Sequence, residues 1–372
     1  MIAKGTYKIA LAVTNDIATD GRLLRHAAAL KEAGHEVILI GRELPWSRPL
    51  QLPYKTIRVK LRHRKGWRFY AEYNQRLTKE LRQLNADIVW ANDTDTLIGC
   101  WLAAKLTLHP VKLVMDAHEL FPEVPEIQHK PLVRWVWRTI ERLLLPTCDA
   151  RLTVCDSIAD HYRQTLGADM TVVRNLSSGK WDMEHGKQPQ ANKQFHTLLY
   201  QGAVNVGRGV DWAIDALEWL PDCRLVVAGS GDLLEQMKTY ASRKSWSDRV
   251  EFLGHVSLED LHKLTPQADV GLVMLEDMGL SYHYALPNRI GDFVAAGVPM
   301  VVSDLPEMAR VVRKYGVGEV MQAPGEKALA ESIKRVLARK WSDNDFAAAR
   351  SDMDWNKEKE KIAECVNSIM CK

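Results

Sequence analysis

The sequence predicts an α/β fold made of two doubly wound parallel sheets. Short apolar runs rich in β-branched residues alternate with longer segments of helical periodicity, and this alternation occurs twice along the chain. Strands separated by helices pair in parallel through right-handed crossovers. Between the two regions lies a polar stretch, SSGKWDMEHGKQPQANKQ, which has the composition of a linker. With 372 residues the chain exceeds the size at which a single core usually stops growing, so we expect two domains.

Five apolar runs in each half are predicted to be strands. In the first half they are residues 8–13, 36–40, 87–90, 112–115 and 150–154. In the second half they are residues 197–200, 224–228, 250–253, 270–274 and 299–303. We therefore expect an N-terminal domain at 1–176, a linker at 177–195 and a C-terminal domain at 196–350. Residues 351–372 are predicted to form a C-terminal helix, with packing back on the N-terminal domain as one option.

The composition is that of an ordinary globular protein. Hydrophobic residues make up 46% of the chain and charged residues 26%, which argues against a disordered or fibrous chain. Charged residues interrupt every apolar window before it reaches the roughly 20 residues that cross a bilayer. The first apolar stretch is too short for a signal peptide, so we expect a cytoplasmic protein. Six scattered cysteines form no CxxC pair and are expected to be reduced, buried thiols.

Polar clusters follow two strands of the first half. Ligands of open α/β sheets bind beyond the carboxyl ends of the strands, so these clusters are candidate sites. Asp20, Gly21 and Arg22 end a polar loop that opens a helix, whose N-terminal amides favour an anion or a sugar. The alternative is that this loop only caps the helix. His118 and Glu119 follow the fourth strand, and a strand-end His beside carboxylates is as consistent with a ligand site as with a structural role.

Glycine-bearing loops follow the first two strands of the second half. The segment from Gly202 to Arg208 joins a strand to a helix, an arrangement that suits a diphosphate. Glycines let backbone amides approach a phosphate closely, and Arg208 offers a bidentate donor pair. The alternative is a tight turn with a solvated Arg. Gly229 and Gly231 repeat the pattern more weakly, because a single GxG also occurs in ordinary turns.

Residues 279–299 place polar and aromatic side chains at the start of a predicted helix. Asn288 and Asp292 are four residues apart and share one helix face, and Arg289 lies between them. A carboxylate near this helix N-terminus is able to bind a ribose diol. The alternative is local capping or pairing of Asp292 with Arg289 on an exposed helix.

These segments together resemble retaining GT-B glycosyltransferases, specifically the family 4 group of bacterial polysaccharide enzymes. The resemblance rests on the His118–Glu119 pair, the QGAVNVGRG loop and the YALPNRIGDFVAAGVP segment, and it spans nearly the whole chain. It implies a GT-B fold, with two Rossmann-like domains that face a central cleft. It also implies that the C-terminal domain holds a nucleotide-sugar donor.

The resemblance implies roles for individual residues. Arg208 would contact the donor diphosphate, Asp292 the ribose hydroxyls, and His118 the reacting sugar. We accordingly assign catalytic roles to His118, Arg208 and Arg289. The donor-binding set is Gly202, Gly229, Gly231, His255, Ser281, Tyr284, Ala285, Leu286, Pro287, Asn288 and Asp292, and the acceptor-side set is Asp20, Gly21, Arg22, Asp93 and Glu119.

The chain departs from the family pattern in three respects. Ala203 stands where many relatives have an Arg, and Arg208 stands where they have a Lys, so the loop has one cation fewer. Diphosphate binding is therefore expected to depend on Arg289 as well. Asp292 is shorter by one methylene than the usual Glu, and Tyr284 takes the place of the first acid of a common pair of glutamates.

The implied reaction is a retaining transfer of a hexosyl-type sugar from a UDP- or GDP-sugar to a glycan or lipid-linked acceptor, in cell-envelope polysaccharide synthesis. Cationic side chains and helix N-termini would stabilise the departing diphosphate, so no metal or other cofactor is expected. A metal-dependent alternative rests on the DxD sequence Asp93-Thr94-Asp95. Two further alternatives are a sugar-nucleotide epimerase on the same fold and a non-catalytic nucleotide-sugar-binding subunit of a polysaccharide assembly. Turnover separates both from a transferase.

Residues 55–82 combine positive charge with aromatic side chains. The segment from Lys55 to Arg82 holds ten Lys or Arg but only two acids, although the net charge of the whole chain is only +3. Its aromatic residues are Trp67, Phe69, Tyr70 and Tyr73. This composition favours peripheral contact with an anionic membrane, at the inner face of the plasma membrane, with residues 134–138 as an extension. The alternative is a solvated helix face. Nucleic acid is not an expected partner, because no recognition module is present.

Overall fold

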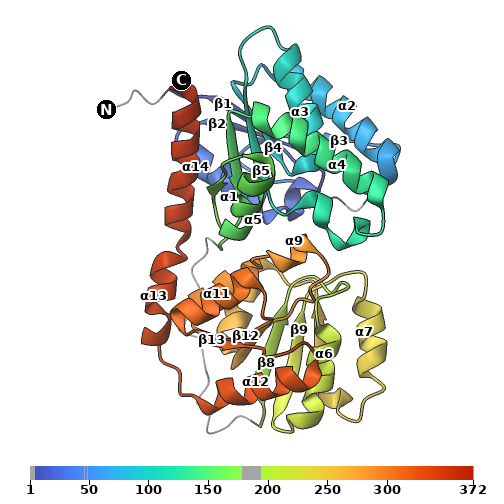
Figure 1. Ribbon diagram of the computed structural model, residues 1–372, viewed down its shortest axis with the longest axis vertical. Helices are drawn as coiled ribbons and strands as arrows, with labels where there is room; N and C mark the ends of the chain where they lie inside the picture. Colours follow the sequence, from blue (N-terminus) through green and yellow to red (C-terminus); the bar gives the residue numbers. More distant parts are fainter. Residues whose placement is uncertain (1–4, 46, 48, 178–193, 372) are drawn as a thin grey trace. The chain divides into compact units, whose positions relative to one another are not determined.

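The protein folds into two compact units. The computed structural model describes residues 5–45, 47, 49–177 and 194–371, so most of the predicted linker lies outside the described residues. The first unit comprises Met1–Asn175 and Asn356–Lys372, and the second comprises Leu176–Trp355. Within each unit the strands form one sheet with helices on its faces (Figure 1).

The sheet of the first unit has seven strands in the order β3-β2-β1-β4-β5-β6-β7, and all neighbours are parallel. The strands are β1 (Lys8–Ala12), β2 (Glu36–Arg42), β3 (Lys55–Val59), β4 (Ile88–Asn92), β5 (Lys112–Ala117), β6 (Ala150–Thr153) and β7 (Thr171–Val172). The strand order reverses between β1 and β4. At such a switch point the chain leaves two adjacent strands toward opposite faces, which opens space beyond their carboxyl ends.

The sheet of the second unit has six parallel strands in the order β10-β9-β8-β11-β12-β13. They are β8 (His196–Gln201), β9 (Cys223–Ala228), β10 (Val250–Gly254), β11 (Val270–Val273), β12 (Met300–Val302) and β13 (Gly318–Val320). Here the order reverses between β8 and β11. Each unit therefore has the doubly wound architecture that the sequence predicts.

Helices cover both sheets. Those of the first unit are α1 (Gly21–Glu32), α2 (Gly66–Leu84), α3 (Thr94–Leu106), α4 (Pro131–Leu144), α5 (Asp156–Leu166) and most of α14 (Trp355–Met370). Those of the second unit are α6 (Val210–Ala216), α7 (Leu234–Ala241), α8 (Leu258–Leu264), α9 (Leu280–His283), α10 (Asn288–Ala296), α11 (Pro306–Tyr315), α12 (Glu326–Ala338) and α13 (Asn344–Asp352).

The central strands form because their residues are apolar on both faces. A parallel strand covered by helices on both sides requires a nearly continuous apolar run. In the second sheet, alternate residues of one strand supply two different cores. Leu199 and Val226 belong to one core, which also contains Phe293 of α10, whereas Leu198 and Leu225 belong to the core on the other face.

The structure differs from the sequence prediction in several elements. The sequence prediction missed the strands β3, β7 and β13, which are short or lie at a sheet edge. The predicted C-terminal helix is interrupted at Met353 and Asp354, which separates α13 from α14. All six cysteines are free, but Cys371 is exposed, so the expectation of a buried thiol is wrong there. Among the described residues, no helix combines the length and apolar character that a membrane span requires.

The helix α14 is tied to the rest of the first unit by a buried carboxylate. Glu358 is fully buried and accepts a hydrogen bond from Nε of Arg174 at 2.7 Å and from Nζ of Lys361 at 2.7 Å. It also accepts a hydrogen bond from the backbone N–H of Arg174 at 3.0 Å. Lys359 adds an ion pair to Glu32 at the end of α1.

We predict that Glu358→Gln lowers the free energy of unfolding of the first unit by about 3 kcal/mol, because two cations lose a buried anionic partner. Urea unfolding followed by intrinsic fluorescence measures this loss. Glu360→Gln on the exposed side of the same helix is the control and is expected to cost less than about 0.5 kcal/mol. Equal stability of the two variants would contradict the prediction.

Candidate functional site

In the first unit, polar side chains gather where β1 and β4 end, at the switch point. Asn92, the last residue of β4, donates a hydrogen bond from Nδ2 to the carbonyl of Ala12 at the end of β1, at 3.0 Å. Thr14, just after β1, donates to the carboxylate of Asp95 at 2.5 Å. These contacts join the two strands at the point where their helices diverge.

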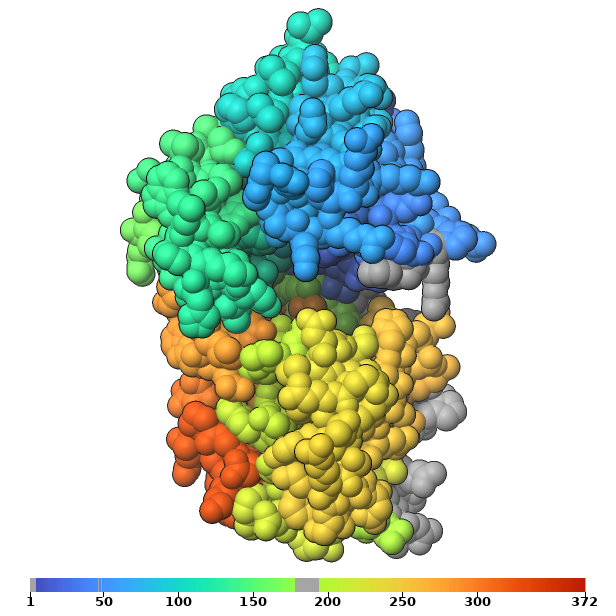
Figure 2. All heavy atoms as spheres, turned by 90° about the vertical axis from the view of Figure 1, so that its right-hand side faces the viewer, coloured from blue at the N-terminus to red at the C-terminus, as the bar shows by residue number. Residues whose placement is uncertain are grey.

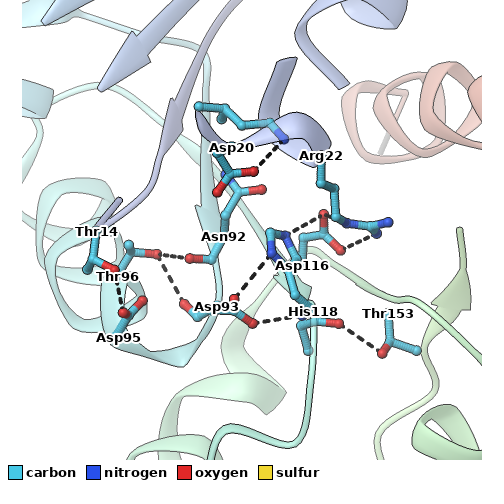
Figure 3. A network of polar contacts seen from close by, with 12 residues as sticks. Thr14, Asp20, Arg22, Asn92, Asp93, Asp95, Thr96, Asp116, His118 and Thr153 are labelled. Carbon is cyan, nitrogen blue, oxygen red and sulfur yellow. Dashed lines mark hydrogen bonds and ion pairs between the residues drawn. The ribbon is translucent and has the colours of Figure 1, made fainter. Parts of the chain in front are cut away.

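His118 lies between two carboxylates at this edge (Figure 3). Its Nδ1 is 3.2 Å from Asp93, and its Nε2 is 3.4 Å from Asp116. The backbone N–H of His118 also donates to Asp93 at 2.7 Å. The imidazole remains 19% exposed, whereas Asp116 is completely buried behind it. His118 is therefore held firmly and still presents one edge to a ligand.

Arg22 and His26 complete the network from α1. Nε and Nη2 of Arg22 bind both carboxylate oxygens of Asp116, at 2.9 and 2.6 Å, and Nη1 donates to the carbonyl of Val173. Nδ1 of His26 lies 3.3 Å from Asp116. Arg22 is almost fully buried, so in this structure it holds Asp116 in place, and its contact with an acceptor stays a prediction.

The charges of this network follow from burial and pairing. Burial opposes the charged form of His118, but Asp93 and Asp116 outweigh it and raise the pKa of His118 to about 9. Burial would raise the pKa of Asp116, yet Arg22 and the two histidines hold that pKa well below its usual value. Burial raises the pKa of Asp93. At neutral pH, His118 is therefore an imidazolium beside an ionised Asp116.

Asp93 has an unusual backbone conformation. Its φ is 64° and its ψ is 162°, a region that a residue with a Cβ rarely occupies. Such strain costs roughly 1–3 kcal/mol and tends to occur at functional sites. It is offset here by the hydrogen bonds of the Asp93 carboxylate to His118. Strain at the residue that orients His118 supports a role for this pair.

The other residues of the predicted acceptor-side set lie around this network. Asp20 caps α1 by accepting a hydrogen bond from the N–H of Leu23 at 2.9 Å, as the capping alternative stated. Gly21 is the exposed first residue of α1, and Glu119 is half-buried next to His118. None of these placements tests a contact with an acceptor, which stays a prediction.

The two carboxylates of the DxD sequence face different partners. Asp93 binds His118, whereas Asp95 lies in the first turn of α3 and accepts from Thr14. Burial raises the pKa of Asp95 to about 7. In the described part of the chain, no group of three or more His, Cys, Asp or Glu side chains is arranged to hold a metal ion.

In the second unit, Arg289 joins the two strands at the switch point. Its Nη1 donates to the carbonyl of Gln201 at the end of β8 at 3.0 Å, and its Nη2 donates to the carbonyl of Met274 just after β11 at 3.3 Å. The guanidinium lies 4.7 Å from the centre of the Tyr200 ring. Arg289 is buried, and these hydrogen bonds go to the backbone carbonyls at the two strand ends. Its contact with a diphosphate stays a prediction.

Gly229 and Gly231 allow the loops after β8 and β9 to pack closely against each other. A Cβ on Gly229 would lie 1.8 Å from the carbonyl oxygen of Gly202, and a Cβ on Gly231 would lie 2.4 Å from that of Val204. The loops after β8 and β9 therefore contact each other through backbone atoms, and only glycine fits at these two positions. The sequence identified these glycines through their possible contact with phosphate, and their mutual packing was not predictable from the motif.

Arg208 is the half-buried cation of the loop after β8. Its guanidinium carbon lies 4.9 Å from the centre of the Tyr282 ring, in the range of a cation–π interaction. Its Nε is buried and has no hydrogen-bond partner among the described residues. Arg208 is therefore held in place by an aromatic ring while a donor group remains unused.

Asp292 is buried at the start of α10 and already has two partners. One carboxylate oxygen accepts from Nε2 of Gln201 at 2.8 Å, and the other accepts from Oγ of Ser177. Gln201 also accepts from Thr265 at 2.9 Å. A contact of Asp292 with a ribose stays a prediction. The sequence reading missed Gln201 and Ser177 because they are 91 and 115 residues from Asp292.

The remaining donor-set residues surround α9 and α10. Residues 285–287 form an extended segment between these helices, and the exposed Asn288 begins α10. Ser281 is buried within α9, and Tyr284 is half-buried at its end. His255 is exposed just after β10, the edge strand.

The aromatic residues of the segment 55–82 do not form the expected surface. Phe69 and Tyr73 are buried where α2 packs on the sheet and on α3, and Tyr70 packs against Trp137 of α4. Only Trp67 is strongly exposed, at 74%. The expectation of a basic and aromatic face is therefore wrong for these side chains, because the apolar stripe of α2 forms the core.

Comparison with known proteins places the chain in a family. The family model described as Glycosyltransferase Family 4 matches residues 22–176, and the model described as Glycosyl transferases group 1 matches residues 195–339. Together with the fold, these two family matches identify a glycosyltransferase with the GT-B fold. Within that class, the chain belongs to the glycosyltransferases of the family 4 type, as the sequence motifs predict.

Three curated proteins are similar to parts of the chain. A glycosyltransferase of Methanocaldococcus jannaschii is 25% identical over 42% of this chain and 39% of its own length. The phosphatidyl-myo-inositol mannosyltransferase of Mycobacterium leprae is 27% identical over 55% of each chain. The GDP-mannose:cellobiosyl-diphosphopolyprenol alpha-mannosyltransferase of Xanthomonas oryzae is 22% identical over 72% of this chain and 68% of its own length. The chain thus spans about half or less of the first two.

Solved structures share the fold. The sucrose-phosphate synthase of Thermosynechococcus elongatus has a TM-score of 0.79 at 17% identity and covers 98% of this chain and 99% of its own. The Anabaena protein HepE, in complex with UDP-glucose, has a TM-score of 0.73 at 15% identity and covers 97% of this chain and 100% of its own. At these identities the likeness concerns the fold, and the predicted GT-B fold is confirmed.

The raised pKa of His118 makes its contribution to stability depend on pH. A histidine whose pKa is higher in the folded state than in the unfolded state stabilises the fold below the unfolded value, about 6.5, and loses that contribution as pH rises through the folded value. Here the folded value is about 9. We therefore predict that His118→Gln destabilises the protein more at pH 6 than at pH 9.5.

Denaturant unfolding of the wild type and of the variant at both pH values measures this difference. His129→Gln, at an exposed position of the same unit, is the control and should have the same small effect at both pH values. An equal loss for His118→Gln at both pH values would show that the imidazolium is not paired as described.

Proposed function

We propose that the protein transfers a hexosyl-type sugar from a nucleoside-diphosphate sugar, UDP- or GDP-linked, to a glycan or lipid-linked acceptor, with retention of configuration and without a metal. In this reaction the bond between the anomeric carbon and the phosphate oxygen breaks, and the acceptor oxygen bonds to the same carbon on the same face. The nucleoside diphosphate leaves with the negative charge. Stabilisation of that charge is the main task of the protein.

The observation that carries this proposal is the position of Arg208. It follows the first strand of the second sheet, lies over the Tyr282 ring and has a buried Nε without a hydrogen-bond partner among the described residues. Arginine suits phosphoryl oxygens because its planar donors bind them in pairs. The backbone N–H of Leu286 and those at the N-terminus of α10 would add further donors. HepE, which shares this fold, is solved in complex with UDP-glucose, and this supports a nucleotide sugar as the donor.

The first unit would supply the acceptor side. His118 is the candidate for contact with a substrate hydroxyl, because it is charged, firmly held and still partly exposed. The names of two relatives include lipid-linked acceptors, a phosphatidyl-myo-inositol and a cellobiosyl-diphosphopolyprenol. They support a lipid-linked acceptor here, and with it a role in envelope polysaccharide synthesis at the cytoplasmic face of the plasma membrane.

A nucleotide-release assay tests the proposal. Purified protein is incubated with a panel of UDP- and GDP-sugars, with and without EDTA and a membrane-lipid extract, and released UDP or GDP is measured. We expect release with one donor, unchanged by EDTA and increased by the lipid extract. Release that EDTA abolishes would contradict the metal-free mechanism. Binding of a donor without any release would indicate a non-catalytic nucleotide-sugar-binding subunit.

We predict that Arg208→Ala raises the dissociation constant for the donor roughly 10- to 100-fold, because a charged hydrogen bond is worth about 1.5–3 kcal/mol. Isothermal titration calorimetry with the donor found in the release assay measures this change. Arg243→Ala, at an exposed position of the second unit, is the control for loss of one positive charge. Unchanged affinity of the Arg208 variant, with an unchanged melting temperature, would contradict the proposed role.

A further inference from the structure

The helix α4 buries an acid beside the aromatic Trp137 on its inner side and exposes large apolar side chains on its outer side. Its inner side carries Glu141, a buried acid that accepts hydrogen bonds from Thr94 at 2.6 Å and Tyr162 at 2.9 Å. Arg134, also toward the interior, pairs with the buried Glu123 at 2.6 Å. A surface helix normally places apolar residues inward and charged residues outward.

The outer side of α4 is apolar. Leu132, Trp135 and Leu143 are 72%, 61% and 61% exposed. Val133 and Val136 are exposed as well. Leu132, Trp135, Val136 and Leu143 are spaced by three, four and seven residues, so they lie on one side of this fourteen-residue helix. We call this patch, Leu132, Val133, Trp135, Val136 and Leu143, the α4 face.

Arginines border the α4 face, and no exposed acid of α4 offsets them. The only acid of the helix, Glu141, is buried. Arg138 and Arg142 lie beside Trp135 along a groove of about 410 Å³ between α4 and α5. Arg138 is 56% exposed although it pairs with Glu123. Apolar residues flanked by arginines suit the boundary between lipid chains and phosphate headgroups, because an Arg can bury its aliphatic part while its charge stays with the phosphates.

The N-terminal part of α2 lies next to this helix. Tyr70 of α2 and Phe121 each pack edge-on against Trp137 of α4, with 4.9 Å between ring centres. Figure 2 shows α4 and α2 adjacent on one face of the first unit. The exposed Trp67 stands one helical turn before Tyr70, next to Arg68, whose guanidinium lies over its ring. The neighbouring helix thus adds a further exposed indole and a further cation.

We propose that the α4 face docks the first unit on an anionic lipid bilayer. Leu132, Trp135 and Leu143 enter the boundary of the acyl chains, and Arg138 and Arg142 bind lipid phosphates. Exposed leucines and an indole lie beside the exposed Arg142, whereas Arg138 is already paired with Glu123. This combination favours the boundary of an anionic bilayer over a second protein, because lipid phosphates neutralise such a cation while the apolar side chains enter the acyl chains. Docking of the α4 face would bring the protein to the membrane that holds a lipid-linked acceptor, and this role of the face rests on the proposed function.

Vesicle co-sedimentation of the full chain tests the proposal. The probes are vesicles of phosphatidylcholine alone and vesicles that contain about one-third phosphatidylglycerol. We expect binding to the anionic vesicles, weaker binding to the neutral ones, and a decrease at high salt. The triple variant Leu132→Ser/Trp135→Ser/Leu143→Ser should lose at least about tenfold in partition coefficient, because three apolar side chains no longer enter the lipid. Arg142→Gln should lose roughly fivefold on anionic vesicles only.

The matched control is Leu106→Ser/Leu108→Ser. These two leucines are also strongly exposed on the first unit, 51% and 105%, but they lie at the last residue of α3 and just beyond it. This control should bind vesicles like the wild type. Equal loss in the control and the triple variant would overturn the assignment to the α4 face. Wild-type protein that does not bind vesicles, or that forms a dimer abolished by the triple variant, would overturn the lipid partner.

The same variants separate this inference from the proposed function. Donor binding measured by calorimetry and turnover with a water-soluble acceptor should remain unchanged in the triple variant, whose melting temperature reports its folding. Loss of vesicle binding with intact nucleotide release supports the membrane face. Vesicle binding by a wild type that releases no nucleotide from any donor would overturn the transferase and leave the docking surface in place.

Discussion

The reversal of strand order in each sheet is the constraint on which the candidate site residues of each unit depend. Where the order reverses, the chain continues from two neighbouring strands toward opposite faces of the sheet. The backbone carbonyls at the carboxyl ends of these strands then need partners other than strand residues. Each unit satisfies these carbonyls with a side chain. Asn92 donates to Ala12 in the first sheet, and Arg289 donates to Gln201 and Met274 in the second. Buried backbone acceptors must be paired, so these side chains fix the positions from which the functional loops start.

The two units use the space thus opened in different ways. In the first, a buried anion, Asp116, lies between Arg22 and His118 and holds His118 as an imidazolium at the edge. In the second, backbone-to-backbone packing of the loops at Gly202 and Gly229 leaves no room for side chains and places Arg208 against an aromatic ring. The first unit therefore provides the positive charge of His118, and the second provides a closely packed loop that carries Arg208.

The sequence could predict those features that depend on local pattern. Apolar runs identified the central strands, and the motif around Asp292 identified the start of α10. Short edge strands such as β13 were missed because a three-residue strand has no measurable periodicity. His118 was recognisable at a strand end, but its partnership with Arg22 through Asp116 joins residues 94 positions apart, which no local pattern encodes. For the same reason, the sequence could not show that Arg289 uses its donors on the strand ends.

The direction in which a helix turns its apolar side is the hardest of these properties to read from composition. The segment 55–82 is rich in aromatic and basic residues. Its helix α2 nevertheless packs Phe69 and Tyr73 into the core, as the apolar side of an ordinary amphipathic surface helix does. The helix α4 also buries the aromatic Trp137, but it buries the acid Glu141 beside it and leaves several large apolar side chains exposed. Burying ion pairs rarely adds stability compared with apolar packing, and exposing leucines adds none. The exposed leucines and indole of α4 are therefore better explained by the lipid surface proposed for its outer side than by the stability of the fold.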